Sequence, residues 1–502
     1  MQNPKTILIV IILLFFIGCR KNISNEITIT GKITGATPEK LEYTVPKEGV
    51  FIYGFKEYGF KKNVKLDSLG QYQIKIPIEK IAFVCLMAPK KSPVTLIVEP
   101  GNAYVVNFDF TQEASSKTYK ILGSTKKIQE LYNKLPLPEH IQVAARPFFK
   151  DSVASQIQSK IADLKGQELS PFKDLLAKDS ISKSMYDFIE LDRSYYYSAV
   201  QGTVGFIKFI MNEREPGVFT EDLKNMWTNT FNNDLLSRAD FQKTNWGYAL
   251  AENYLFYKDY NEFSFDIDKI RNSNDDIFFL RRTLNNAEKH LSPYALEYYK
   301  AVYLYMELLQ KDYQKEFITI FDEFKKDYPT STYSEYLAPM VATVVDFHKK
   351  TEQPYDASIK FVENYDKITN FTDLLSQFKG KKIYIDIWGT WCSPCKKEFE
   401  HKDDLKKLLN SKDVEVLYIC EGRNSKEDVW KNMIKFYDLE GHHLITNEEL
   451  LADIIKIFGN NSSFYYPRYI LIDENGKTIQ SVAAKPSQLE KLKEQLTQFE
   501  SI

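Results

Sequence analysis

Two cysteines separated by two residues carry the clearest chemistry in this sequence. The segment Trp391-Cys392-Ser393-Pro394-Cys395 follows an apolar run at 383–388 and opens a stretch of helical character. A helix N-terminus carries unpaired N–H groups and a partial positive charge, which favour a thiolate over a thiol. The helix also places the second sulfur one turn behind the first, where it can attack a mixed disulfide formed there. The spacing therefore predicts reversible disulfide chemistry, with Cys392 as the nucleophile and Cys395 as the resolving thiol.

Other uses of a closely spaced cysteine pair fit the sequence less well. A structural zinc site needs four ligands, usually from two such pairs, and the chain has no second pair. Covalent haem attachment needs a histidine directly after the second cysteine, where Lys396 stands. A purely structural disulfide would gain little stability from closing so short a loop. We therefore expect neither a metal nor a cofactor at this site.

The first residues have the pattern of an export signal. Lys5 precedes an unbroken apolar run at 7–17. This run is too short for a hydrocarbon core of about 30 Å at about 1.5 Å per residue, so it predicts a signal peptide over residues 1–18. The run ends in Phe-Ile-Gly-Cys, which resembles the lipobox of bacterial lipoproteins and implies cleavage before Cys19 and lipid attachment to it. An ordinary secretory signal is the alternative.

Both interpretations of the signal place the mature chain outside the cytoplasm. The residues after Cys19 are basic, whereas surface-exported lipoproteins of Bacteroidota tend to carry an acidic run there. The resemblance to bacterial lipoproteins therefore implies a periplasm-facing one, on either the inner or the outer membrane. The net charge of the chain is −2 and its charges are interspersed, so nucleic acid is not expected as a partner. Five cysteines in 502 residues are too few for a disulfide scaffold. We expect Cys85 and Cys420 to be buried, although Cys420 ends an apolar run and could be a third thiol near the pair.

Three folded regions are predicted after the signal peptide. Over residues 19–110, strand-like runs alternate with turn signals, which is typical of a small antiparallel β-sandwich. Residues 111–353 have a helical pattern, and aromatic side chains at helical spacing, as at 313–324, indicate a buried face rather than a surface for unfolded clients. Residues 354–502 alternate strands with helices and end in a hairpin through Asn475-Gly476, which predicts an α/β domain.

The last region resembles the thioredoxin fold, because the cysteine pair lies at its first strand-to-helix crossover. More narrowly, Trp-Gly-Thr-Trp at 388–391, Lys-Lys-Glu at 396–398 and Tyr-Pro-Arg-Tyr-Ile-Leu-Ile-Asp at 466–473 are similar to the TlpA/ResA-like extracytoplasmic thiol-disulfide oxidoreductases. The order of the three regions resembles lipoproteins of Bacteroidota. The chain departs from the family pattern at Glu400, where family members often have a proline that kinks the helix. The resemblance therefore does not predict whether the helix is kinked in this chain.

The resemblance implies a proton-transfer role for Asp386, and helical spacing offers Glu398 as a second candidate. Asp386 matches the buried acid that the thioredoxin family uses to move a proton to and from the resolving thiol. A carboxyl group in an apolar strand is expected to have a raised pKa, which suits such a role near neutral pH. Glu398 lies one helical turn after Cys395 and is a second candidate for the same cavity.

The resemblance also implies a client-binding groove beside the cysteines. Pro467 aligns with the cis-proline loop of the family, which would expose the backbone of Tyr466 to an extended client strand. Trp391 precedes the first thiol and Pro394 lies between the two, and these residues complete the predicted binding site.

Together these features predict a protein disulfide reductase that acts on disulfide-containing exported proteins. A membrane electron donor of the CcdA/DsbD type would recharge it, since an oxidising envelope keeps the cysteines joined. The direction of electron flow rests on the family resemblance, so a disulfide oxidase or isomerase is an alternative. A non-enzymatic lipoprotein that binds metal or clients is another, although no methionine- or histidine-rich tract supports a metal function.

Overall fold

A computed structural model describes residues 25–35, 41–45, 61–89, 91–111, 118–138, 140–244, 246–263, 265, 276–459 and 464–497. The chain divides into two compact units, residues 1–257 and 258–502. The predicted signal peptide and Cys19 lie outside the described residues. Among the residues that are described, no helix has both the length and the apolar character that crossing a membrane requires.

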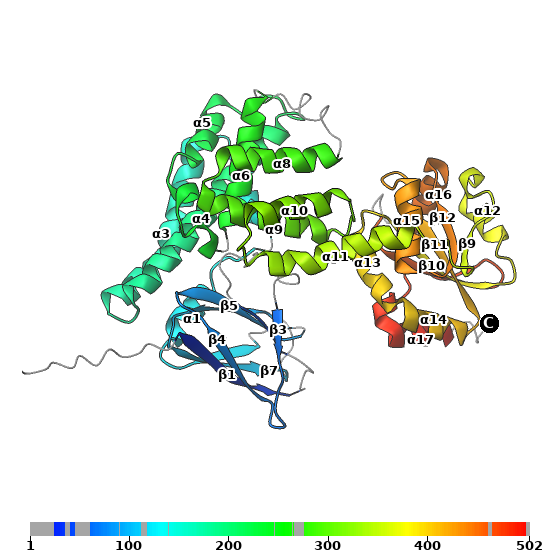
Figure 1. Ribbon diagram of the computed structural model, residues 1–502, viewed down its shortest axis with the longest axis horizontal. Helices are drawn as coiled ribbons and strands as arrows, with labels where there is room; N and C mark the ends of the chain where they lie inside the picture. Colours follow the sequence, from blue (N-terminus) through cyan, green and yellow to red (C-terminus); the bar gives the residue numbers. More distant parts are fainter. Residues whose placement is uncertain are drawn as a thin grey trace, which may run out of the picture. The chain divides into compact units, whose positions relative to one another are not determined.

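Two four-stranded sheets begin the first unit (Figure 1). One has the strand order β4 (Gln71–Pro77), β1 (Glu26–Thr34), β7 (Ala103–Asp109) and β8 (Tyr119–Leu122). The other has the order β3 (Lys61–Val64), β2 (Leu41–Thr44), β5 (Ala82–Met87) and β6 (Val94–Val98). Along β4 exposed and buried residues alternate, as the period-two pattern predicts. Buried side chains from both sheets share one hydrophobic core, and Cys85 is buried on β5.

Two features of these sheets differ from the sequence prediction. Strand β1 pairs in parallel with β7, whereas an all-antiparallel arrangement was predicted. The local turn signals define neighbouring strands, but they carry no information about two strands so far apart in the chain. Strand β8 lies in the region predicted to be helical from residue 111, and it pairs antiparallel with β7. Four residues are too few to show a clear periodicity.

Helices make up the remainder of the first unit. Their bounds are α1 (Lys126–Tyr132), α2 (Ile141–Ala145), α3 (Ala154–Ala177), α4 (Lys183–Met211), α5 (Glu221–Thr230) and α6 (Gly247–Glu262), the last of which continues into the second unit. The run of three tyrosines at 195–197 on α4 is buried. These aromatic residues therefore belong to the core rather than to an exposed surface.

The second unit opens with further helices. They are α8 (Asp276–His290), α9 (Pro293–Leu309), α10 (Glu316–Asp327) and α11 (Ser334–Thr351). Ser292 is the N-cap residue of α9, and Pro293 takes the first helical position, where its missing N–H has no intrahelical partner to lose. Phe317, Phe321 and Phe324 on α10 are buried, which confirms that the aromatic stripe faces a core.

A six-stranded sheet forms the centre of the C-terminal domain. Its order is β14 (Thr478–Gln480), β13 (Arg468–Ile472), β10 (Lys382–Trp388), β11 (Val414–Cys420), β12 (Gly441–Ile445) and β9 (Ile359–Phe361). Strands β10, β11, β12 and β9 run parallel, and β13 is antiparallel to both β10 and β14. This arrangement confirms the predicted fold class, in which N-terminal sheets and a helical middle region precede a thioredoxin-like α/β domain.

Helices cover both faces of this sheet (Figure 1). The side chains of β10 alternate between the two faces and so pack into two separate cores. Ile383, Ile385 and Ile387 pack with α12 (Phe371–Ser376) and α16 (Glu448–Phe458). Tyr384 packs on the other face with α14 (Lys402–Asn410) and α17 (Leu489–Leu496), and α15 (Glu427–Tyr437) follows β11. Because successive side chains of a strand alternate, Asp386 and Trp388 lie on the same face as Tyr384.

The helix after the cysteines is interrupted where the family proline is missing. Helix α13 (Ser393–Glu398) passes through a 3-10 turn (Phe399–His401) into α14. Glu400 lies in the middle of this turn, so the break in the helix occurs without a proline. The side chain of Glu400 accepts a hydrogen bond from Lys311 Nζ at 2.9 Å, and Lys311 belongs to the connection between α9 and α10.

Candidate active site

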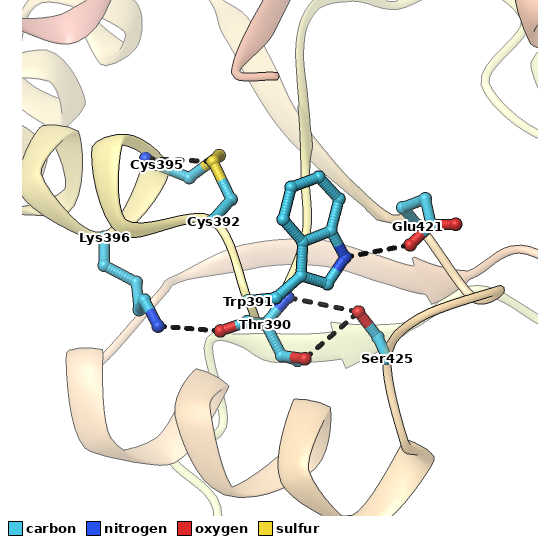
Figure 2. Close-up of a disulfide and its surroundings, with 7 residues drawn as sticks. All are labelled: Thr390, Trp391, Cys392, Cys395, Lys396, Glu421 and Ser425. Carbon is cyan, nitrogen blue, oxygen red and sulfur yellow. Dashed lines mark hydrogen bonds between the residues drawn. A yellow bond between two sulfur atoms is a disulfide. The ribbon is translucent and has the colours of Figure 1, made fainter. Parts of the chain in front are cut away.

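The two cysteines lie where strand β10 gives way to helix α13. Cys392 is the N-cap residue of α13, and Cys395 lies in its first turn. Their Sγ atoms form a disulfide, and the backbone N–H of Cys395 donates to Cys392 Sγ at 3.2 Å (Figure 2). Cys395 is fully buried and Cys392 is 3% exposed. The pair is thus placed to open and close one disulfide, with Cys392 as the less buried of the two sulfurs.

The loop before the cysteines is held from two sides. The backbone N–H and the hydroxyl of Thr390 both bond to Ser425 Oγ at 3.1 Å. On the other side, Lys396 Nζ donates to the carbonyl oxygen of Thr390 at 2.8 Å (Figure 2). Contacts from the loop after β11 and from α13 itself therefore fix the residues that precede Cys392.

Lys396 is a functional candidate to which the sequence analysis assigned no role. Its side chain is buried, and its ammonium group also donates to the carbonyl oxygen of Lys311 at 3.2 Å. Burial lowers the pKa of Lys396 to about 8, against an opposing effect of Asp312. The two acceptors, the carbonyl oxygens of Thr390 and Lys311, are backbone atoms that only the fold brings close to Lys396. These contacts could therefore not be predicted from the sequence.

Trp391 presents an exposed indole ring next to Cys392. The residue is 46% exposed, and its Nε1 donates to Glu421 Oε2 at 3.0 Å (Figure 2). Glu421 follows β11 directly and was not identified from the sequence. The only hint was that the carboxyl end of β11, at Cys420, was expected to face the cysteine pair.

The loop of Pro467 lies beside the same tryptophan. The Tyr466–Pro467 peptide bond is cis. The ring of Tyr466 meets that of Trp391 edge-on, with 5.3 Å between centroids. Burial raises the pKa of Tyr466 to about 12, so its hydroxyl is protonated. The structure therefore brings the predicted groove residues Trp391, Tyr466 and Pro467 together, while Pro394 lies in the first turn of α13.

Asp386 is enclosed in the sheet rather than exposed at a strand edge. It is 1% exposed, and its neighbours across the sheet are Tyr418 on β11 and Tyr469 on β13. Among the described residues, no hydrogen-bond partner reaches its Oδ1 atom. Burial, and secondly the negative charge of Glu398, raise the pKa of Asp386 well above its usual range. The group is therefore protonated under conditions in which an exposed aspartate is charged.

Glu398 has the opposite electrostatic environment. Burial acts to raise its pKa, but hydrogen bonds from Lys485 and Ser487 outweigh that effect and hold the pKa below its usual range. Lys485 Nζ donates at 2.9 Å, and the N–H and hydroxyl of Ser487 donate at 2.9 and 3.1 Å. Two acidic groups on one side of the sheet thus have pKa values displaced in opposite directions, a pattern typical of sites that move protons.

Cys420 is buried at the end of β11. Its neighbour across the sheet is Trp388, and its Sγ donates to the carbonyl oxygen of Glu421 at 3.7 Å. Burial raises the pKa of the Cys420 thiol, which keeps it in the unreactive protonated form. This environment favours the expectation of a buried, inert residue over that of a third reactive thiol.

Residues 356–496 match the family described as Redoxin. The C-terminal region of this chain is a redoxin domain. It is similar to the thiol-disulfide oxidoreductase ResA of Bacillus thuringiensis subsp. konkukian, with 34% identity over 125 residues. That match covers 25% of this chain and 65% of the relative, so the chain spans slightly less than two thirds of the relative's length.

Solved structures also align with the redoxin domain. One is the thioredoxin domain of a thiol-disulfide oxidoreductase from Bacteroides vulgatus, with 22% identity and a TM-score of 0.22 over 25% of this chain and 83% of that chain. Another is the pneumococcal exposed lipoprotein thioredoxin from Streptococcus pneumoniae, with 27% identity and a TM-score of 0.20 over 24% of this chain and 89% of that chain.

Proposed function

We propose that the chain is an extracytoplasmic thiol-disulfide oxidoreductase that reduces disulfides of exported proteins. The observation that carries the proposal is the disulfide-bonded pair Cys392–Cys395 at the start of α13. The residue before it, Trp391, contacts Tyr466, whose peptide bond to Pro467 is cis. The similarity of the redoxin domain to ResA supports it.

In the proposed reaction the reduced pair transfers two electrons to a client disulfide. The Cys392 thiolate attacks one client sulfur, forms a mixed disulfide, and expels the second client sulfur as a thiolate. The Cys395 thiolate then attacks Cys392 Sγ, which closes the internal disulfide and releases the client's remaining thiolate. The disulfide present in the structure corresponds to the oxidised state that this sequence of steps leaves behind.

Asp386 is proposed to exchange the proton of Cys395. A buried thiol must lose its proton before it can attack, and Cys395 has no exposed surface through which water could take it. Asp386 has a raised pKa and lies on the face of the sheet that packs against α14, and a carboxyl group with a raised pKa can both accept and return a proton. Glu398 is proposed to keep the pKa of Asp386 high through its charge.

The client is proposed to bind in an extended conformation beside Pro467. A cis-proline loop leaves backbone groups free to pair with a client strand, and Trp391, Pro394 and Tyr466 would flank that strand. Pairing through the backbone accepts many sequences, which suits an enzyme that serves a range of exported proteins.

We further propose that residues 1–18 are removed and that Cys19 carries the lipid, so that the mature protein faces the periplasm from a membrane surface. The oxidised pair then requires a dithiol donor in the membrane, of the CcdA/DsbD type, to return it to the reduced state. The chain itself would carry two electrons at a time between that donor and its clients.

Insulin reduction by the full mature chain, with a dithiol as the electron source, tests this proposal. We expect insulin reduction that depends on both Cys392 and Cys395, and no binding of Cu(I) tight enough to compete with the reaction. Oxidation of reduced clients without insulin reduction would favour an oxidase or isomerase. Tight copper binding without disulfide exchange would favour a metal-binding lipoprotein.

A further inference from the structure

Glu421 is buried beside an exposed tryptophan and has all its acceptor positions occupied. It is 2% exposed, and its own N–H donates to the carbonyl oxygen of Trp388 at 2.7 Å. One carboxylate oxygen accepts from Trp391 Nε1 at 3.0 Å and from the N–H of Asn424 at 3.1 Å. The other accepts from the N–H of Arg423 at 3.1 Å and from the amide of Asn424 at 3.4 Å. The carboxylate of Glu421 thus holds the side chain of Trp391 and the turn at Arg423 and Asn424 in place.

Three contacts fix the indole of Trp391 although nearly half of its surface is open to solvent. Glu421 holds Nε1, and the ring of Tyr466 meets the indole edge-on. The indole also lies against Gly389, where an added Cβ would come within 2.8 Å of Nε1. Residue 389 therefore has to be glycine for the ring to occupy this position.

A rigid exposed aromatic surface lowers the entropic cost of binding, because its rotamer is already selected before the partner arrives. Tyr465, in the same loop as Tyr466, is 73% exposed and adds further aromatic surface to that loop. Trp391 directly precedes Cys392, so this surface begins at the residue next to the reactive sulfur. The surface is therefore suited to apolar or aromatic side chains next to a client's disulfide.

We propose that Glu421 is a positioning residue that holds the Trp391 indole beside Cys392, and that this surface selects client disulfides flanked by apolar or aromatic residues. The inference rests on the disulfide exchange proposed above. A purely structural role is the competing explanation, since Glu421 also stabilises the turn through Arg423 and Asn424.

Two peptide disulfides that differ only in having phenylalanine or serine next to the cysteine test the proposal. The readout is the ratio of kcat/KM for the two peptides, measured on the reduced full-length chain. We expect the wild type to prefer the phenylalanine peptide, mainly through a lower KM. Glu421→Gln keeps one acceptor oxygen of two, and we expect it to reduce the ratio about threefold, the effect of one hydrogen bond.

Trp391→Phe and the double variant Glu421→Gln/Trp391→Phe separate positioning from turn stability. Trp391→Phe removes the indole N–H and leaves the bonds to Arg423 and Asn424 intact. If Glu421 acts through Trp391, the ratio in the double variant equals that of Trp391→Phe alone. The matched control is Glu427→Gln, which removes a carboxylate bonded to Tyr365 and Lys431, and we expect the wild-type ratio for it.

A spectroscopic measurement checks that the ring itself moves. The emission of Trp391, taken as the difference between each protein and its Trp391→Phe counterpart, should show lower anisotropy in Glu421→Gln than in the wild type. Additive losses in the double variant, or equal ratios in all proteins, would overturn the proposal while leaving disulfide exchange intact. Absence of exchange with both peptides would instead overturn the proposed function together with this inference.

Discussion

Lys396, the residue after the second cysteine, bonds through its buried ammonium group to the carbonyl oxygen of Thr390, two residues before the first cysteine. The helix that carries Cys395 thereby holds the loop that carries Cys392. The same ammonium group bonds to the carbonyl oxygen of Lys311, in the connection between α9 and α10. A helical segment that precedes the redoxin domain in the sequence thus contributes to the rigidity of the cysteine site.

Lys396→Met is expected to lower the free energy of unfolding by about 1–3 kcal/mol, because it leaves a buried carbonyl oxygen without its donor. Urea denaturation measures the change. Lys397→Met is the matched control, since it removes the same charge from an exposed position on the same helix, where about 0.5 kcal/mol or less is expected. Equal losses for the two variants would show that the contacts of Lys396 contribute nothing.

Asp386→Asn is expected to raise the stability of the protein more at alkaline than at mildly acidic pH. The pKa of Asp386 is higher in the folded than in the unfolded chain, because burial opposes its charge. The stability that its proton provides is therefore complete below the usual aspartate pKa and is lost as the pH rises through the folded-state value. Asparagine has no proton to lose at this position.

Thermal unfolding of wild type and Asp386→Asn over a series of pH values tests this expectation. The difference in Tm should grow with pH. A constant difference would show that Asp386 does not titrate with a raised pKa. In kinetic measurements, Asp386→Asn should also slow release of the mixed disulfide, by about 100-fold if the group is a general base.

Glu398→Gln is expected to lower the pKa of Asp386, because the charge of Glu398 contributes to raising it. Infrared spectroscopy follows the protonated carboxyl band of Asp386, which Asp386→Asn identifies by its disappearance. The band should titrate at a lower pH in Glu398→Gln than in the wild type. Glu400→Gln, which removes an exposed carboxylate bonded to Lys311, should leave the band unchanged. If the band titrates at the same pH in Glu398→Gln as in the wild type, the charge of Glu398 does not influence the pKa of Asp386.

Cys420→Ser is expected to change neither the clients trapped nor the rate of exchange. The thiol is fully buried and its pKa is raised, so it stays protonated and out of reach of a client. Cys395→Ser, which cannot resolve a mixed disulfide, is compared with Cys395→Ser/Cys420→Ser by mass spectrometry of the trapped complexes. A different set of complexes in the double variant would make Cys420 a third participating thiol.

The parts of the site that are local in sequence could be predicted from it. The cysteine pair is recognisable by its spacing, and Asp386 is recognisable as an acidic residue in an apolar run. The loop with Pro467 was predicted from the family resemblance. The alternation of strands and helices also predicted the α/β domain, and β11 ends at Cys420, as the apolar run before it predicted.

Residues that act through tertiary contacts could not be predicted in this way. Lys396 and Glu421 are ordinary charged residues in the sequence, and only the fold buries them against Thr390 and Trp391. Strands β9 and β12 could not be predicted for a different reason. They have three and five residues, and β12 begins with Gly-His-His, so neither shows a strand pattern.

The redox potential of the Cys392–Cys395 couple in the full mature chain tests the central claim most directly. Equilibration against glutathione, followed by alkylation and mass analysis, gives the fraction of the pair that is reduced. A reductase requires a potential near that of thioredoxin, about −270 mV, and this is the value we predict. A potential near about −120 mV, typical of a strong oxidant, would contradict the account.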